Sequence, residues 1–423
     1  MSNSVLKKIV YFVRVRLVSP LCISEGDGIL TDSDVLRNGE GNPFIPGSSL
    51  AGAMRAYLDK EKFQECIFGY EDMSTNKGRM SSLFISDLCF EGGIHTTVRD
   101  SVALSNKKTT ISGAKFDMEV VDTGAEGSFW MELVIREKDD EIHLLEQLQA
   151  VLAGWKEREI RFGSKKSRGY GEVQILSVKE KVFDRTNILE YGNAYSDVEN
   201  GPEGWTDMTF EGEGETSRKY VTISLPLKLE GGISIRQYAV KKEEPDFVHI
   251  TANGKPVIPG TSFSGAIRHR LSDILEELGV SNTEQIVDEI FGYVKKNGKE
   301  STARVSNVVI GECVLENSQK LTMVRNGISR FESGAKDGAL FKELSYVGGY
   351  TVLEIKVKKT GNLDKIIGLL LLVLKDVQNG FLAVGGQTAV GRGLFSANGN
   401  IAISSECTQE QYLAAAADML VRG

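Results

Sequence analysis

The chain contains the same short motifs twice, and this internal repeat constrains its fold more than any other feature. Four motifs recur in the same order: IPGSSLAGAMR at Ile45 and IPGTSFSGAIR at Ile258, FGY at Phe68 and Phe291, GAK at Gly113 and Gly334, and GYG at Gly169 with GRG at Gly391. The spacing between the members of each pair stays between 213 and 223 residues. We therefore predict two homologous domains in tandem, with an insertion of about ten residues between the first two motifs of the second copy.

An acidic stretch separates the two copies. Between Thr186 and Ser217 there are eight Asp and Glu residues and no Lys or Arg, so this stretch carries the charge of −8 that the whole 423-residue chain carries. Its EGEGE run has neither helical nor strand periodicity, which predicts a solvated linker. The predicted domains are 1–180 and 218–423, joined by an acidic linker at 181–217. Because the remainder is neutral, the net charge does not exclude a nucleic-acid partner.

The hydrophobic periodicity predicts the same order of elements in both copies. Alternating strands are predicted at Val10–Val18 and Tyr220–Leu229, and helical patterns follow each IPG and recur at Glu141–Trp155 and Leu363–Val377. A last strand follows each glycine-rich loop. The order β-α-β-β-α-β, found twice, predicts an α+β protein with two tandem ferredoxin-like domains. Polar, Gly- and Thr-rich sequence at about 90–130 indicates an inserted hairpin.

Cysteine usage and hydropathy bear on the compartment. Five dispersed cysteines without a CxxC spacing indicate buried thiols in a reducing compartment. The longest apolar run, Ile366–Leu374, is shorter than the ~20 residues that a membrane span needs. The N-terminal residues alternate charged and apolar side chains and lack the apolar centre of a signal peptide. We therefore expect a cytoplasmic protein without a membrane partner.

Each IPG turn precedes a helix, and the N–H groups at the start of a helix attract phosphate. Ser48 or Ser49 in the first copy and Thr261 or Ser262 in the second copy are the expected N-caps. Arg55 lies two turns into the first helix, and Arg268 holds the equivalent place in the second. The pattern therefore predicts an anion-binding helix start in each copy, while an ordinary capped helix is the alternative.

A glycine-rich loop, RFGSKKSRGYGEV, lies between the second helix and the last strand of the first copy. Its glycines permit close backbone approach and its basic side chains supply charge, which is typical of a phosphate cradle. The candidate RNA-binding residues here are Lys165, Lys166, Arg168, Gly169 and Gly171. The second loop, AVGGQTAVGRGLFSA, keeps Gly391, Arg392 and Gly393 but has no lysines, which indicates a weaker backbone contact. A solvated basic turn is the alternative, and a P-loop is excluded because no GxxxxGK[ST] occurs.

Carboxylates precede each IPG turn. Asp32 and Asp34 lie before the first, and Glu243, Glu244 and Asp246 lie before the second. Loop acids beside a phosphate site could hold a metal ion or orient a ribose hydroxyl, although most loop acids are only solvated. The four histidines have no metal-ligand spacing, and no motif of a nucleophilic Ser or Cys occurs.

Taken together, IPGSSLAGAMR, FGY, ISGAKFDMEVVDTGAEGSF and the terminal glycine-rich loop resemble the RAMP superfamily of CRISPR-associated proteins. The closest resemblance is to the backbone subunits of type III interference complexes. It covers nearly all of the first copy and, more loosely, the second. Tandem fusions of two such domains occur in some type III subtypes, notably the D subtype, and this chain is similar to them.

The resemblance implies that each domain is a modified RNA-recognition-motif fold that binds crRNA. A thumb-like hairpin, at about 90–125 and 312–340, would wedge the duplex of guide and single-stranded target RNA at regular intervals, beside other subunits of the complex. Many family members cut target RNA with a loop aspartate and a divalent metal, Mg or Mn. In DSDVLR, Asp32 falls in the catalytic, metal-holding place and Arg37 in the Arg place, with Asp34 as the alternative. In the second copy Asp246 is the nearest match and Glu244 the competitor.

Three functions follow as hypotheses. The first is a backbone subunit with metal-dependent endoribonuclease activity inside the RNA-guided complex. The second is a non-catalytic scaffold that holds crRNA and neighbouring subunits. The third, a nuclease that processes guide RNA by itself, ranks last because no histidine is placed as a general base near the glycine loop.

Overall fold

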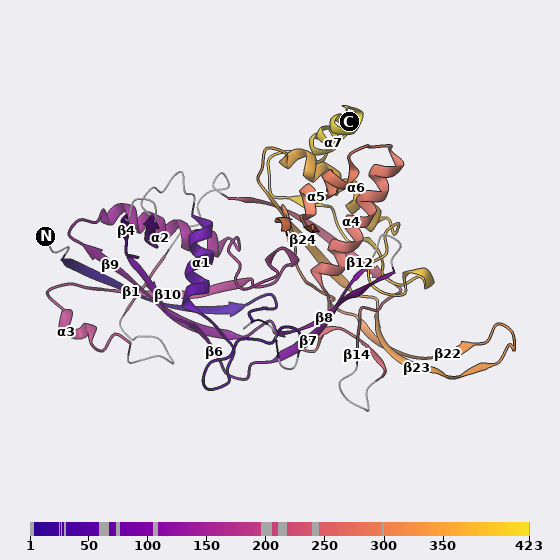
Figure 1. The fold of residues 1–423 in the computed structure, drawn as a ribbon, viewed down its shortest axis with the longest axis horizontal. Helices are drawn as coiled ribbons and strands as arrows, with labels where there is room; N and C mark the ends of the chain where they lie inside the picture. Colours follow the sequence, from indigo (N-terminus) through magenta and orange to yellow (C-terminus); the bar gives the residue numbers. More distant parts are fainter. Residues whose placement is uncertain are drawn as a thin grey trace. The chain divides into compact units, whose positions relative to one another are not determined.

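The computed structural model describes the chain except for residues 1–3, 25, 27, 29–30, 59–66, 73–76, 105–108, 196–204, 210–217, 239–244, 298–299 and 423. It divides into two compact units (Figure 1). Unit 1 comprises Met1–Val98, Asp117–Lys166 and Tyr170–Arg218, and unit 2 comprises Arg99–Phe116, Ser167–Gly169 and Lys219–Gly423.

Unit 1 is built on one antiparallel sheet in the order β11-β10-β1-β9-β6-β2, with β5 also paired to β9. The strands of this sheet are β1 (Val5–Leu17), β2 (Phe44–Ile45), β5 (Leu83–Ile85), β6 (Leu88–Glu91), β9 (Glu126–Arg136), β10 (Val173–Phe183) and β11 (Thr206–Asp207). The helices of the first repeat are α1 (Gly47–Tyr57), α2 (Glu141–Lys156) and α3 (Ile188–Tyr191). The remaining strands of the first repeat are β3 (Tyr70–Asp72), β4 (Lys77–Arg79), β7 (Thr96–Leu104) and β8 (Thr110–Val121).

Unit 2 has a central antiparallel sheet in the order β20-β24-β12-β25, with β26 also paired to β12, and a second sheet in the order β13-β23-β15-β14, with β22 on β23. The two sheets use β12 (Tyr220–Glu230), β13 (Gly232–Ile233), β14 (Arg236–Tyr238), β15 (Phe247–His249), β20 (Val308–Ile310), β22 (Gln319–Ile328), β23 (Ala335–Val347), β24 (Tyr350–Lys358), β25 (Leu394–Ala397) and β26 (Ala402–Ile403). The smaller strands are β16 (Thr251–Ala252), β17 (Lys255–Ile258), β18 (Tyr293–Asn297), β19 (Glu300–Arg304) and β21 (Cys313–Val314). The helices are α4 (Gly260–Glu277), α5 (Thr283–Phe291), α6 (Leu363–Gln378) and α7 (Gln409–Arg422).

The same topology is present in both units. In chain order the four strands of the motif are β1, β5, β9 and β10 in unit 1, and β12, β20, β24 and β25 in unit 2. In both sheets the spatial order is fourth, first, third, second. This arrangement is the ferredoxin-like β-α-β-β-α-β motif. The predicted fold class is therefore confirmed, including the inserted hairpins β7–β8 and β22–β23.

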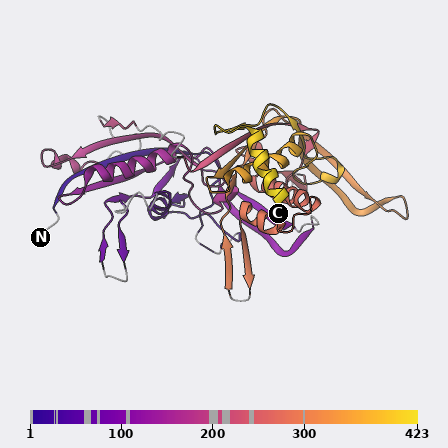
Figure 2. The same cartoon turned by 90° about the horizontal axis from the view of Figure 1, so that it is seen from above.

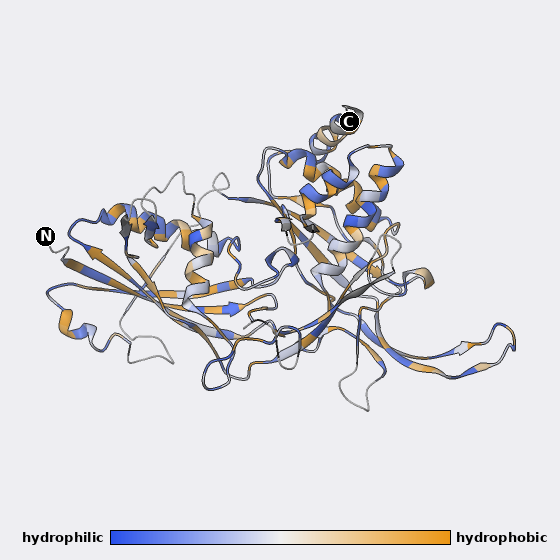
Figure 3. Cartoon of the chain, viewed as in Figure 1, coloured by the Kyte–Doolittle hydropathy of each residue, from blue (hydrophilic) through white to orange (hydrophobic). Residues whose placement is uncertain are grey.

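The helices of each motif cover one face of its sheet. In unit 1 the side chains of Tyr11, Val13 and Val15 pack against Leu50 of α1 and Trp155 of α2. In unit 2 alternate residues of β12 pack against α4 and α6 in the same way. Figure 3 shows apolar and polar residues interspersed along these helices, as expected for amphipathic helices on a sheet. The four predicted helices are confirmed. They could be predicted because the apolar periodicity of a helix is visible in residues that are close together in the sequence.

The inserted segments form hairpins and extra helices. The strands β22 and β23 project from unit 2 as a long hairpin (Figure 1), and Figure 2 shows β18 and β19 projecting as a shorter one. In the second copy α4 and α5 span the stretch from the IPG motif to Phe291 of FGY, whereas residues 59–66 of the first copy lie outside the described residues. Neither α5 nor α7 was predicted from the sequence.

The cysteines and the linker differ in part from what the sequence predicts. Cys22 and Cys313 are buried as expected, but Cys89 and Cys407 are exposed, so the prediction of buried thiols was wrong for those two. Residues 184–195 and 205–209 of the predicted solvated linker are described, and they pack on the sheet of unit 1, whereas EGEGE lies outside the described residues. Among the described residues, none of the helices has the length and apolar character needed to cross a bilayer.

Candidate nucleic-acid interface

Asp32 lies in the loop before α1 and is bound to the inserted hairpin of the first repeat. Its carboxylate accepts the N–H of Asp117 in β8 at 2.9 Å, and its own N–H donates to the Asp117 carboxylate at 2.9 Å. The Asp32 side chain remains exposed to solvent. An exposed carboxylate is therefore held at a fixed place beside the base of the hairpin.

Asp34 has a different role from Asp32. Its Oδ1 atom accepts the main-chain N–H of Thr31 at 2.9 Å and the Thr31 hydroxyl at 2.7 Å. These bonds close the turn between Thr31 and Asp34, and the Asp34 side chain is half-buried. Of the two acids left open by the sequence, Asp32 is the one that points into solvent.

Asp246 is the structural equivalent of Asp32 in unit 2. Ser24 bridges to Val35 in unit 1, and Arg236 pairs with His249 in unit 2. Asp32 lies three residues before Val35, and Asp246 lies three residues before His249. The side chain of Asp246 is exposed, and its Oδ2 atom accepts the N–H of Lys342 in β23 at 2.8 Å.

The hairpin register agrees with this equivalence. Leu21 bridges to Val121, and its counterpart Ile233 pairs with Tyr346. Asp117 lies four residues before Val121, and Lys342 lies four residues before Tyr346. The competitor Glu244 and the neighbouring acid Glu243 lie outside the described residues.

Arg37 fixes the acid-bearing loop to the hairpin. Its guanidinium forms an ion pair with Glu119 of β8 at 2.5 Å, and the N–H of Val35 donates to the other Glu119 oxygen at 3.0 Å. The Arg37 side chain is exposed and the Glu119 side chain is mostly buried. The residue in the expected Arg place therefore holds the loop in position.

The carboxylates of Asp32 and Asp117 are of the chemical type that divalent metal ions take as ligands. Asp32 and Asp117 bring two carboxylates together, and magnesium commonly takes one or two carboxylates with waters and substrate phosphates. No cluster of three or more His, Cys, Asp or Glu side chains suited to a metal occurs among the described residues. In the described part of unit 2, Asp246 lies opposite Lys342 at the equivalent place.

The helix starts differ from the predicted capping. Both α1 and α4 begin at the glycine of IPG, and the preceding proline is the N-cap without a side-chain bond. Ser48, Ser49, Thr261 and Ser262 therefore lie inside the first turn, and the prediction that one of each pair is the N-cap was wrong. At the start of α1 the carboxylate of Asp87 accepts the Gly47 N–H at 2.8 Å, so one N–H predicted to bind phosphate already has an anionic partner.

The two arginines of these helices have different surroundings. Arg55 is exposed on α1. Arg268 donates to the Asp288 carboxylate at 2.7 Å and to the Gly292 carbonyl oxygen at 3.0 Å. The Arg268 guanidinium thus links α4 to α5, which is a structural role that the motif alone did not indicate.

The two glycine-rich loops have the same backbone conformation. Gly171 and Gly393 have φ of +75° and +74°, and a Cβ on either would lie less than 2 Å from the carbonyl oxygen of Phe162 or Val384, respectively. Gly169 and Gly391 have φ of +85° and +81°, with Gly169 buried and Gly391 exposed. Lys165 and Gln387 occupy the same left-handed position, at φ +56° and +59°. The final glycines therefore serve close packing of the loop on itself.

The charge on the first loop is smaller than its composition suggests. Arg158 and Arg161 both form ion pairs with Glu172, whose side chain is buried. Sequence reasoning missed Glu172 because it lies at the end of the loop, beyond the basic run. Lys166 and Arg168 are exposed, although partial burial of the Lys166 ammonium lowers its pKa. These two side chains carry the positive charge that faces solvent in the loop.

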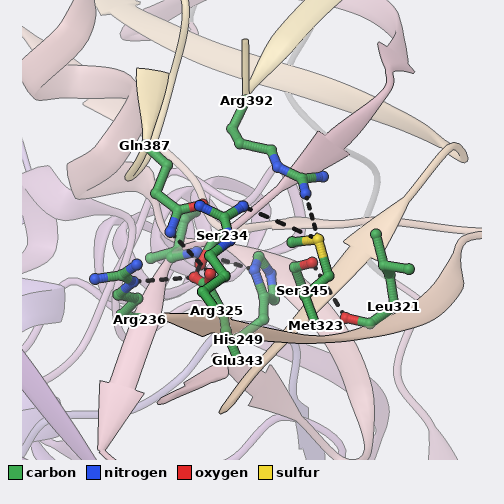
Figure 4. A network of polar contacts seen from close by, with 11 residues as sticks. Ser234, Arg236, His249, Leu321, Met323, Arg325, Glu343, Ser345, Gln387 and Arg392 are labelled. Atoms are coloured by element: carbon green, nitrogen blue, oxygen red, sulfur yellow. Dashed lines mark hydrogen bonds and ion pairs between the residues drawn. The ribbon is translucent and has the colours of Figure 1, made fainter. Parts of the chain in front are cut away.

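A polar network joins the second glycine loop, β13 and the β22–β23 hairpin (Figure 4). The buried carboxylate of Glu343 accepts bonds from the Ser234 hydroxyl at 2.6 Å, Arg236 at 3.0 Å and Gln387 at 2.8 Å. Burial opposes its ionisation, but the Ser234 and Arg236 contacts lower the pKa of Glu343 overall. Unit 1 has Cys22 and Met118 as a buried sulfur pair at 3.9 Å, in the places of Ser234 and Glu343.

Arg392 lies beside this network. Its guanidinium covers Gly232, where a Cβ would lie 1.9 Å from a guanidinium nitrogen. Arg392 and Arg325 of β22 both donate to the sulfur of Met323, at 3.2 and 4.0 Å. A thioether is a weak acceptor, so the Met323 sulfur compensates little of the positive charge of either side chain. Arg392 was a predicted RNA-binding residue, whereas Arg325 was missed although it lies in the hairpin that the resemblance implied at about 312–340.

His249 predicts a pH dependence of stability in unit 2. Its Nδ1 accepts the Ile235 N–H at 3.0 Å and its Nε2 lies 3.0 Å from the Val257 carbonyl oxygen, which suits the neutral ring. Burial lowers the pKa of His249 from 6.5 to about 4. The unfolded chain binds a proton below pH 6.5 and the folded chain does not, so stability should fall between pH 6.5 and 4, by up to about 3 kcal/mol.

Urea unfolding followed by circular dichroism across this pH range checks the prediction. His249→Gln should show a flatter dependence on pH than the unsubstituted protein. His143→Gln is the matched control, because His143 lies partly exposed on α2. Equal pH dependence in the protein and in His249→Gln would contradict the assignment.

Comparison with known proteins agrees with the duplicated architecture. The family model of the RAMP superfamily matches residues 14–174 and 231–396, once in each repeat and over more than half of the chain. A search of curated proteins finds no significant match. RAMP domains have modified ferredoxin-like folds, as both units do. The chain therefore belongs to the RAMP superfamily as a tandem of two RAMP domains, and it is a CRISPR-associated RNA-binding subunit.

Proposed function

We propose that this protein is a backbone subunit of a type III CRISPR effector complex, which binds crRNA, holds the guide–target RNA duplex and cleaves the target strand beside Asp32 and Asp246. One observation supports this proposal most strongly. In each repeat an exposed aspartate accepts a main-chain N–H from the second strand of the inserted hairpin, at the same register. Two unrelated loop acids would not share this position.

The hairpin and the acid have complementary tasks. The β22–β23 hairpin carries exposed apolar side chains toward its tip, with Phe331 97% and Ile328 70% exposed. Such side chains can insert between stacked bases and displace a nucleotide. An aspartate bonded to the base of the same hairpin stays at a fixed distance from the displaced nucleotide, whose 2′-oxygen can then align with the adjacent phosphorus.

The chain's own residues would position the reacting groups. Asp32, with Asp117 beside it, would hold a divalent ion such as Mg or Mn, which when bound stabilises negative charge on the phosphate. The Arg37–Glu119 pair keeps the loop on β8. The glycine loops and their exposed cations contact the guide backbone without reading bases, because base pairing supplies the sequence specificity.

The RNA that co-purifies with the assembled complex tests the proposal. Sequencing should find crRNA, and nuclease digestion should leave fragments protected at a regular interval. The absence of crRNA, or protection without a fixed interval, would sink the backbone assignment. Intact target RNA in the presence of Mg or Mn would favour the non-catalytic scaffold, and cleavage of repeat RNA by the isolated chain would favour guide processing.

The first glycine loop carries a separate prediction. Lys166→Gln with Arg168→Gln should weaken crRNA binding and reduce the slope of log K against log salt by about 1.4, since each lost phosphate contact contributes about 0.7 for a single strand. Arg158→Gln is the control, because Arg158 is paired with Glu172 and should leave the slope nearly unchanged. Fluorescence anisotropy at several salt concentrations measures both. Equal slopes in the unsubstituted protein, the double variant and Arg158→Gln would show that the loop does not contact RNA.

A further inference from the structure

The face of the unit 1 sheet that points away from α1 and α2 is both aromatic and basic. The Phe12 ring of β1 lies 4.7 Å from the Trp130 ring of β9, and the two residues are paired in register. Alternation along β1 and β10 places five cations on the same face, namely Lys8, Arg14, Arg16, Lys179 and Lys181. Glu132 and Glu126 of β9 lie on this face as well and form ion pairs with Lys8, Arg14 and Arg16, so among the five cations it is Lys179 and Lys181 of β10 that favour a nucleic-acid partner. Aromatic rings flanked by cations on an open sheet are the features with which many proteins bind single-stranded nucleic acid.

This face is occupied by the chain itself. We call residues 184–195 and 205–209 the covering segment. Its Tyr195 and Trp205 rings pack against Trp130 at 5.1 and 5.8 Å, and its Tyr191 ring packs against Phe183 at 5.4 Å. Thr206–Asp207 forms β11, which pairs with β10 at the edge of the sheet. These ring contacts are edge-to-face, with interplanar angles of 70–74°, so the segment covers the rings on which bases would stack.

The covering segment also meets the cations of the face. Glu190 forms an ion pair with Lys181 at 2.7 Å, and Asp207 is opposite Lys179 in the ladder. Lys8 lies 4.2 Å from the centre of the Tyr191 ring. The segment thus presents aromatic rings and carboxylates to this face, where a single strand would present bases and phosphates. Its Tyr191 and Tyr195 hydroxyls also donate to the Glu132 carboxylate of β9.

In the described residues of unit 2, a serine and a glutamate stand in the places of the aromatic pair. Leu17 donates its N–H to Ala125, and its counterpart Leu229 donates to Gly349, which sets the register of the two sheets. Phe12 lies five residues before Leu17, and Ser224 lies five residues before Leu229. Their strand partners are Trp130 and Glu354, so the pair of Phe12 and Trp130 in unit 1 corresponds to the pair of Ser224 and Glu354 in unit 2.

The chain after the last strand also takes a different course in the two repeats. In unit 2 it ends in α7, and Gly368 of α6 approaches the α7 backbone at Tyr412. The α7 helix therefore lies against the helical layer. The aromatic pair and the cover thus occur together, in unit 1.

We propose that this sheet face is a binding platform for single-stranded RNA that the covering segment occupies in place of RNA. While the covering segment occupies this face, RNA binds at the hairpins and the glycine loops instead. The proposal concerns a face outside the site described above, so it stands whether or not the aspartates cleave RNA.

Release of the covering segment tests this. The triple variant Tyr191→Ala, Tyr195→Ala, Trp205→Ala removes the ring contacts, and anisotropy of a fluorescein-labelled oligouridine measures the affinity of the full chain. We expect binding about tenfold tighter than that of the unsubstituted protein, because stacking on an aromatic ring contributes about 1–3 kcal/mol per base. Adding Lys179→Gln and Lys181→Gln should reverse the gain. Leu189→Ala is the control, because Leu189 is 92% exposed on α3 and should not alter affinity.

Tryptophan fluorescence reports the release itself. Without Trp205 the chain keeps Trp130 and the fully buried Trp155, so stronger acrylamide quenching means that Trp130 has become accessible. A second variant replaces residues 184–209 with a Gly/Ser linker of equal length and so lacks the segment entirely. Unchanged RNA affinity in that folded variant, with or without new self-association, would overturn the proposal. Loss of all RNA binding in the unsubstituted chain would instead count against the proposed function.

Discussion

Asp32→Asn and Asp246→Asn are each expected to abolish one set of target-RNA cuts in the assembled complex, by about 100-fold or more in rate, while leaving crRNA binding intact. Asparagine keeps an oxygen that can accept the N–H of Asp117 or Lys342, so the loop stays attached to its hairpin. What it loses is the charge needed to hold a divalent ion. A gel of end-labelled target RNA with Mg or Mn present separates the two sets of cuts.

Asp34→Asn is the matched control in the same loop. Its oxygen can still accept the Thr31 bonds that close the turn, so cleavage should stay within about threefold of the unsubstituted complex. Cleavage retained at every position in the Asp32→Asn, Asp246→Asn double variant would refute the catalytic assignment. Loss of cuts in Asp34→Asn alone would transfer the role to Asp34.

Gly393→Ala should unfold the second glycine loop and cost unit 2 about 4 kcal/mol or more of its free energy of unfolding. Gly393 has φ of +74°, and an alanine Cβ would lie 1.9 Å from the Val384 carbonyl oxygen. That oxygen belongs to backbone that is bonded to Gly393, because the Val384 N–H donates to the Gly393 carbonyl at 2.9 Å. Neither partner can move without breaking the loop.

Gly391→Ala separates this overlap from the cost of the left-handed conformation. Gly391 has φ of +81°, but an alanine Cβ there would have no atom within 4 Å beyond its chain neighbours, so the substitution should cost only about 1–2 kcal/mol. Urea unfolding followed by circular dichroism compares the two variants. Similar losses of stability would show that the close packing of the loop is less important than its backbone angles. Gly171→Ala should repeat the large effect in unit 1, where the Cβ would lie 1.8 Å from the Phe162 oxygen.

Much of the fold could be predicted because its signals are local. The repeated IPG, FGY and glycine-loop motifs indicated two domains, and the family model matches each of them. The apolar spacing of Glu141–Trp155 and Leu363–Val377 predicted helices that the structure contains at Glu141–Lys156 and Leu363–Gln378. In such segments each residue's burial is determined by neighbours three and four positions away, which the sequence displays directly.

The candidate site could be predicted only in part. The acids before each IPG were found from the sequence, but the choice between Asp32 and Asp34 depends on which carboxylate the turn uses for its own hydrogen bonds. The equivalence of Asp32 and Asp246 depends on ladder register. Part of that register is set by pairs that are distant in the chain, Leu21 with Val121 and Ile233 with Tyr346. The basic run of the first loop likewise gave no sign that Glu172 pairs with two of its arginines.

The sequence by itself determined the duplication, the order of helices and strands, and the positions of the glycines, because these depend on neighbours along the chain. The tertiary structure alone decided which aspartate faces solvent and which cations stay free of Glu172. It also decided that residues 184–195 and 205–209, acidic in sequence, lie on the aromatic face of the first sheet. The physical reason is common to all three. Ion pairs, ring contacts and ladder hydrogen bonds join groups that are distant in sequence. The residues around one group therefore do not show which distant group it will contact.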